Sequence, residues 1–142
     1  MIRIWYNEAI MYTPEHWKLR ALSSLYAAKI LYREQCFRDV ASRSYYSAYQ
    51  AATAICVEHG DAVNFPAEWN NPSHDQLPDL ILNNGDIART DRRTLYKLLQ
   101  DLRKNREDAD YRVGITIDCE NAYFCLRSAL TVLRILQIEE TS

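Results

Sequence analysis

The most chemically suggestive stretch of the chain is Leu102 to Tyr111, where a cation stands at a position that the helical pattern assigns to an apolar side chain. Apolar residues at spacings of three and four lead into it: Leu95, Leu98, Leu99 and Leu102. Arg106 continues that stripe, and burying an unpaired guanidinium costs on the order of several kcal/mol. Either the helix end opens onto a cleft, or Arg106 pairs with Asp110 one turn later. The alternative is a solvated helix end, since an arginine in a last turn also suits the helix dipole.

The overall charge of the chain limits the kinds of ligand that such an arginine could bind. The net charge is -2, which gives no general attraction to nucleic acid. Any contact with nucleic acid must be local, through a few basic residues: Arg89, Arg92, Arg93, Arg103, Lys104, Arg106 and Arg112. The four cysteines lack the paired short spacing of zinc sites and the three histidines are scattered. We therefore expect no metal site and no cofactor.

The composition indicates one helical domain over residues 1–142. A hydrophobic fraction of 48% and a charged fraction of 25% are typical of a soluble globular protein. Because the chain has only 3 Gly and 4 Pro, its composition favours a small number of long helices over many short strands. Residues 1–12 are too short and too polar for a signal peptide or a membrane span, and we expect them to form an irregular or extended lead. These features favour a cytoplasmic protein with free thiols.

Capping signals place the elements that must position the arginines. Thr13 and Pro14 begin a helix that runs to about residue 34, and a second helix over residues 37–59 ends at Gly60. Residues 61–72 form a loop. A short helix follows to about residue 82, starting at a capping box of Ser73 and Gln76 or at Gln76 itself. A fourth helix spans residues 91–108, and Asp118 caps a fifth. The sum is an all-α antiparallel up-and-down bundle of four long helices and one short helix.

The second helix carries further candidates for ligand binding. Arg43, Tyr46 and Gln50 lie at helical spacing on one face. Arg43 suits a phosphate, although an ion pair with Asp39 or Glu34 is the simpler interpretation. Its tyrosines could stack on bases, but aromatic residues on a long helix more often pack in cores and dimer interfaces.

Three segments, taken in order, resemble the HEPN family. They are the run Ala41–Ala52, which contains Ser-Arg-Ser-Tyr-Tyr, then Ser73-His74-Asp75, and then Leu102–Tyr111 with its Arg-Glu-Asp-Ala-Asp-Tyr ending. The closest branch is that of small stand-alone HEPN proteins. The resemblance implies a helical bundle that dimerises through the faces bearing the motif. Many members are metal-independent RNases with a composite site across the dimer, others pair with small nucleotidyltransferases in toxin–antitoxin systems, and others are non-catalytic.

The chain departs from the catalytic pattern of that family at one position. Catalytic members place a histidine a few residues after the arginine, where this chain has Tyr111, and no histidine follows Arg106. Metal-free RNA cleavage needs a base for the ribose 2′-hydroxyl and a cation for the transition state. Arginine supplies the cation. A tyrosine has an ordinary pKa of about 10 and would need that value lowered by about three units. His74 is the other candidate base, and a structural cap is its alternative role.

Two functions follow. The first is a homodimeric protein of a toxin–antitoxin or defence system that binds RNA or nucleotide in a dimer groove, with at most weak metal-independent RNase activity. Its catalytic candidates are Arg106, Tyr111 and Asp110. Further ligand-binding candidates are Arg103, Arg43, Tyr46 and His74. The alternative is a non-catalytic interaction module that dimerises or binds a nucleotidyltransferase partner.

Overall fold

The chain folds into long helices around one central helix. The computed structural model describes residues 12–139, and within that range every regular element is a helix. They are α2 (Pro14–Arg33), α3 (Phe37–His59), the 3-10 turn η1 (Asp61–Asn64), α4 (Gln76–Leu82), α5 (Arg89–Tyr111) and α6 (Cys119–Ile135). The expected helical class is therefore confirmed for this part of the chain, whereas the expected lead over residues 1–12 lies, apart from Tyr12, outside the described residues.

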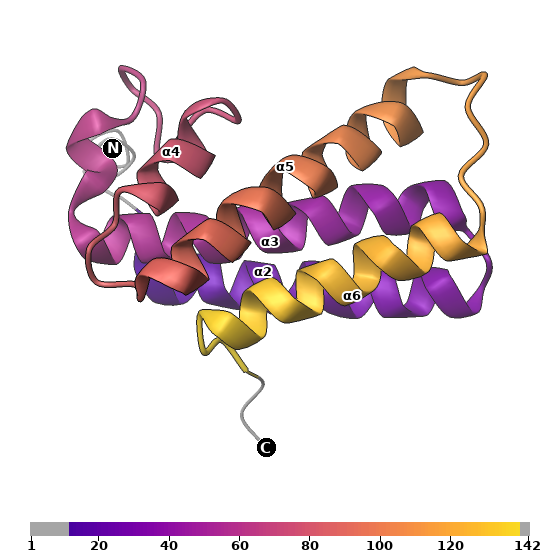
Figure 1. The fold of residues 1–142 in the computed structure, drawn as a ribbon, viewed down its shortest axis with the longest axis horizontal. Helices are drawn as coiled ribbons and strands as arrows, with labels where there is room; N and C mark the ends of the chain where they lie inside the picture. The colour runs from indigo at the N-terminus through magenta and orange to yellow at the C-terminus, as the bar shows by residue number, and fades with distance from the viewer. Residues whose placement is uncertain (1–11, 140–142) are drawn as a thin grey trace, which may run out of the picture.

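Figure 1 shows the four long helices running alternately back and forth along the long axis. Helices α2 and α5 run in one direction, and α3 and α6 return. Helix α3 is the central element, because it packs against α2, α6, α5 and α4. None of the helices within residues 12–139 combines the length and hydropathy needed to cross a membrane.

Local signals explain most helix ends. The Thr13 side chain accepts from the backbone N–H of His16, and the His16 ring accepts in return, so this capping box includes a histidine that the sequence analysis had not assigned. Gly60 ends α3 in the left-handed region at φ 91°. Ser73 and Gln76 exchange the expected capping-box hydrogen bonds, although the helix itself begins at Gln76. Both interpretations of the start of α4 therefore hold in part.

Helix α5 is longer than the sequence predicts. It begins at Arg89 rather than residue 91 and continues to Tyr111, three residues beyond the predicted end. The extension has a tertiary cause: Arg38 of α3 donates to the carbonyls of Asp108 and Ala109, at 3.3 Å and 2.7 Å. Both carbonyls lie in the last turn, where a helix runs short of internal donors. The Asp108 carbonyl also accepts from the backbone N–H of Arg112 at 3.2 Å, so the shorter bond to Ala109 is the main contribution of Arg38 within the helix. Asp110 and Tyr111 consequently sit on a helix instead of in a loop.

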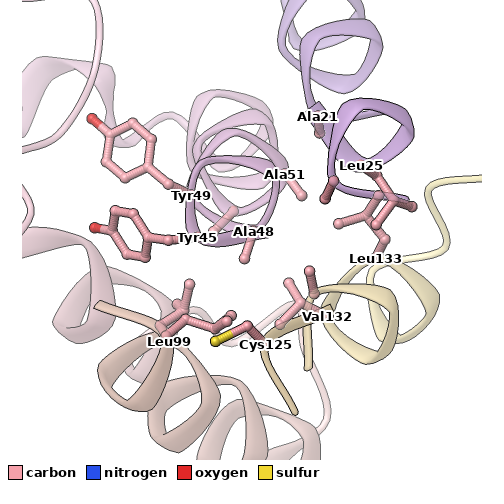
Figure 2. Close-up of a cluster of buried hydrophobic side chains, with 14 of the residues drawn as sticks. Ala21, Leu25, Tyr45, Ala48, Tyr49, Ala51, Leu99, Cys125, Val132 and Leu133 are labelled. Carbon is pink, nitrogen blue, oxygen red and sulfur yellow. The ribbon is translucent and has the colours of Figure 1, made fainter. Parts of the chain in front are cut away.

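The core lies where α3 meets its neighbours, and small residues dominate the contact with α2. Ala21 of α2 and Ala48 and Ala51 of α3 are fully buried, and Figure 2 shows Ala51 facing Ala21 and Leu25. The Ser47 hydroxyl donates to the Ala21 carbonyl at 2.7 Å. Side chains this small let two helix backbones approach closely. Helix α3 is thereby fixed in position and can present its other side to α5.

Candidate functional site

Arg106 lies in a cage of aromatic rings between α5 and α3. It is 5% exposed, as the periodicity of α5 predicts. Its guanidinium carbon lies 5.3 Å from the ring centre of Tyr45, 5.7 Å from that of Tyr46 and 5.5 Å from that of Tyr111. These distances are within the range of cation–π attraction, which strengthens when the cation is shielded from water. The cage explains how the cation is tolerated at a buried position.

The polar contacts of Arg106 are few and long. Its Nη1 donates to the Tyr111 hydroxyl at 3.3 Å and lies 3.9 Å from a carboxylate oxygen of Asp110. The predicted pairing with Asp110 is therefore present, at the outer limit for an ion pair. The Nε atom is buried and has no hydrogen-bond partner among the described residues. A guanidinium has five N–H donors, and within residues 12–139 Arg106 donates one side-chain hydrogen bond.

Asp110 and Tyr111 occupy the surface end of the site. Asp110 accepts from the Ser42 hydroxyl at 3.4 Å, which ties it to α3. Tyr111 is the last residue of α5 and is 71% exposed, so its ring covers Arg106 from the solvent side. Arg38 holds the chain beyond it, by donating to the carbonyls of Val113 and Ile115. Nothing in the sequence pattern had marked Arg38 for this role.

His74 joins the same aromatic cluster from the loop before α4. Its Nδ1 and the Tyr45 hydroxyl form a hydrogen bond of 2.5 Å, and its ring centre lies 5.0 Å from that of Tyr49. Burial, together with the positive charges of Arg106 and Arg103, lowers the pKa of His74 below its ordinary value. Burial also raises the pKa of Tyr45, which therefore stays protonated. His74 is a neutral imidazole near a cation.

Arg103 is engaged in ion pairs with two acidic side chains. Its guanidinium lies 2.6 Å from an oxygen of Asp75 and 3.6 Å from one of Glu107. The hydrogen bond from Arg103 lowers the pKa of Asp75. Asp75 is the neighbour of His74 in the chain, so this pair ties the loop that carries His74 to α5. The direct role of Arg103 is therefore to hold the loop that carries His74 against α5.

Arg43 and Tyr46 form a separate stacked pair. The Arg43 guanidinium lies 5.2 Å from the Tyr46 ring centre. Among the described residues Arg43 forms no ion pair with Asp39 or Glu34. Its guanidinium lies over the Tyr46 ring instead. Tyr46 is half-buried and also faces Arg106, whereas Tyr45 and Tyr49 are buried, as the packing interpretation predicts.

The structure thus gathers Arg106, Asp110, Tyr111, Tyr46 and His74, with Arg43 next to Tyr46 and Arg103 one step away. Sequence reasoning had missed Tyr45, which contacts both Arg106 and His74. From the sequence, the tyrosines of this helix were weighed as packing residues or as rings that stack on bases, and not as partners of Arg106. Across the described residues no group of histidine, cysteine and acidic side chains is arranged to hold a metal ion. The chemistry available is that of a desolvated cation with spare donors beside a neutral imidazole.

Comparison with known families agrees with the motifs. A family model described as HEPN domain matches residues 14–139, nearly the whole chain. Searches among curated proteins and among solved structures returned no match. On the strength of the family match, which spans α2 to the end of α6, the chain belongs to the HEPN domain family.

Proposed function

We propose that this protein binds a phosphate group of RNA or of a nucleotide at Arg106. The observation that carries the proposal is a guanidinium that is 5% exposed and has a buried Nε without a partner among the described residues. A phosphate oxygen pair matches the fork of an arginine in a bidentate contact. Membership of the HEPN family independently suggests an RNase-like or nucleotide-binding helical module.

Access to Arg106 requires Tyr111 to move. Tyr111 contributes one face of the cage and the one side-chain hydrogen bond that Arg106 donates within the described part of the chain. It is exposed and at the end of its helix, so turning its side chain outward costs little packing. The bound state then exchanges a hydrogen bond of 3.3 Å for charge-assisted contacts to phosphate.

In this proposal two copies face each other at the ends of α5 and share a groove. The setting is a toxin–antitoxin or defence system, in which a small nucleotidyltransferase is a partner. Family resemblance supports both statements. Co-purification of the protein with the product of a neighbouring nucleotidyltransferase gene tests the second.

Binding is tested with a fluorescent single-stranded oligoribonucleotide and anisotropy, at two salt concentrations. Arg106→Lys keeps the charge but removes the fork, and should weaken binding at least tenfold. Arg134→Lys is the matched control, because Arg134 is exposed on α6 and is not among the basic residues considered for nucleic acid; it should change affinity less than about twofold. Equal affinities for the wild type and Arg106→Lys would show that phosphate binds elsewhere.

Cleavage is expected to be weak at neutral pH, because Tyr111 stands at the position of the family's histidine. Total RNA incubated with the protein and a chelator should remain largely intact, and Tyr111→His should increase cleavage. A second possibility has one specific observation behind it: His74 is a neutral imidazole that shares the Tyr45 and Tyr46 rings with Arg106. Robust cleavage that survives Tyr111→Phe and disappears in His74→Gln would establish His74 as the base.

A further inference from the structure

Of the three rings that enclose Arg106, two are fixed by the core and one is free to move. Tyr45 is 2% exposed and Tyr46 is half-buried, and both belong to α3, the central helix of the bundle. Figure 2 shows Tyr45 on the side of α3 that faces away from α2, among core residues. Tyr111 is 71% exposed and ends α5. A ligand therefore reaches Arg106 from one direction, through the place that the Tyr111 ring occupies.

A single opening distinguishes between two kinds of phosphate. An internal phosphodiester is joined to a nucleoside on both sides, so both must be accommodated at the same opening. A terminal phosphate is joined on one side and presents three free oxygens. Two of them can meet the guanidinium fork, to which the buried and unpartnered Nε of Arg106 belongs. The depth of a cation that is 5% exposed therefore favours a phosphate at the end of a chain.

A terminal phosphate also carries more charge than an internal one. Its second negative charge forms with a pKa of about 6, so the group is mostly a dianion at neutral pH. Arg106 supplies one positive charge, and Asp110, 3.9 Å from its Nη1, already offsets part of it. A dianion beside this one cation would leave buried negative charge uncompensated. The site therefore needs a second cation when a terminal phosphate is bound.

His74 is placed to become that second cation. Its ring centre lies 5.5 Å from that of Tyr45, and the Arg106 guanidinium carbon lies 5.3 Å from the centre of the same ring. The Nδ1 atom of His74 is hydrogen-bonded to the Tyr45 hydroxyl, whereas its Nε2 has no hydrogen bond to another described residue. Burial and the nearby arginines lower the pKa of His74 in the free protein. A bound dianion raises that pKa again, because an anion favours the charged form of an imidazole.

The charged and titratable groups that face His74 come from α5, from its own loop and from α3. They are Arg103, Arg106, Glu107, Asp75, Tyr45, Tyr46 and Tyr49. Arg103 is already paired with Asp75 and Glu107, and burial raises the pKa of Tyr45, which stays uncharged. Arg106 is therefore the charge near His74 that a ligand can neutralise.

We propose that the phosphate bound at Arg106 is a terminal phosphate group, at the 5′ or 3′ end of an RNA strand or on a single nucleotide, and that His74 is the second cation beside it. The inference rests on the proposed binding of phosphate at Arg106 and adds the kind of phosphate. An internal phosphodiester, with one negative charge and two nucleosides, fits this site less well.

The first test compares different ends on one sequence. Three 2′-O-methyl oligoribonucleotides, which cannot be cleaved through a 2′-hydroxyl, carry a fluorophore on a central base. They end in a 5′-phosphate, in a 3′-phosphate, or in hydroxyls at both ends. Anisotropy should show that at least one phosphorylated strand binds about tenfold more tightly than the strand without phosphate. Arg106→Lys should abolish the difference, and Arg134→Lys, the matched control, should retain it.

The outcomes separate this inference from the proposed function. Equal binding of the three strands, still weakened by Arg106→Lys, would overturn the terminal phosphate and leave phosphate binding at Arg106 intact. Binding that Arg106→Lys does not weaken would contradict both. Competition with uridine 5′-monophosphate and with its P-methyl ester repeats the comparison on a small ligand. The monoester should displace the phosphorylated strand at a lower concentration, and no difference between the two would count against the inference.

The second test measures protons. Calorimetric titration of the phosphorylated strand at about pH 7, in two buffers of different ionisation enthalpy, should show net proton uptake by the wild type. Selection of the dianion only releases protons from the phosphate, so net uptake identifies the imidazole. His74→Gln, checked for folding by thermal unfolding, should lose the uptake and most of the preference for a terminal phosphate. The absence of uptake in the wild type, or an unchanged preference in folded His74→Gln, would refute the role of His74.

Discussion

Helix α3 meets α2 and α5 in two contrasting ways. Toward α2 it presents alanines and serines, and the polar groups there find close partners: Ser47 bonds to a carbonyl, and the Ser24 hydroxyl and Gln50 amide bond at 2.7 Å. Toward α5 it presents tyrosine rings around a cation whose contacts are long and incomplete. The first contact is optimised for packing. The second holds unused hydrogen-bonding capacity, which is what a binding site requires before its ligand arrives.

The largest expected effect lies in the packed contact. Ala51→Leu adds volume where α3 faces Ala21 and Leu25 and leaves no space for it, so we expect a loss of about 3 kcal/mol in the free energy of unfolding. Urea denaturation measures it. Ala67→Leu, at an exposed position, serves as the control. An unchanged midpoint in Ala51→Leu would mean that the helices separate more easily than their close packing implies.

Arg38→Ala tests how the second contact is held in place. The substitution removes donors from four carbonyls at the end of α5 and in the chain after it, and we expect a loss of about 2 kcal/mol. Hydrogen exchange should increase in residues 108–115 before it increases elsewhere. Arg38→Lys keeps a cation near the helix end but not the fork, and should recover only part of the loss. Full recovery by lysine would indicate a purely electrostatic role.

Replacing Arg106 by an uncharged side chain distinguishes its contribution to the stability of the fold from its contribution to phosphate binding. Arg106→Met fills similar space without a charge, so the free energy of unfolding should stay within about 1 kcal/mol of the wild type or increase. Phosphate-dependent binding should be lost in the same variant. Calorimetric unfolding and oligonucleotide anisotropy on one preparation provide both values. A strongly destabilised Arg106→Met would show that the cage depends on its cation.

The smallest effect is a dependence of stability on pH. Because the pKa of His74 is lowered in the folded protein, the unfolded chain binds the proton first, and stability should fall as pH decreases below the ordinary histidine value of about 6.5. His59 behaves oppositely, since its hydrogen bond to Asp86 raises its pKa and adds stability that is lost as pH rises. Urea midpoints between about pH 5 and pH 8 should lose the first trend in His74→Gln and the second in His59→Gln.

These differences show which features the sequence alone could predict. Thr13, Gly60 and Asp118 are local caps, and each marks a helix boundary that the structure contains. The periodicity of α5 likewise placed Arg106 on the buried side. The end of α5 was predicted too early, because its last turn is held by Arg38, about 70 residues earlier in the chain.

The composition of the site was harder to predict for the same physical reason. The tyrosines of α3 were correctly expected to pack, but their rings also enclose a cation from another helix, and spacing within one helix carries no information about that contact. Arg103 was grouped with Arg106 because they are neighbours in sequence. In the structure its strongest partner is Asp75, which the loop before α4 brings to it.

The position of Arg38 has a mechanical consequence. It stands in the first turn of α3, directly after the corner that joins α2 to α3, and its hydrogen bonds reach the turn of α5 that carries Asp110 and Tyr111. One planar guanidinium therefore joins that corner to the turn that carries the covering ring over Arg106. The exposed Cys36 lies two residues before Arg38, so a fluorophore attached there would report opening of the ring from a point outside the aromatic cage.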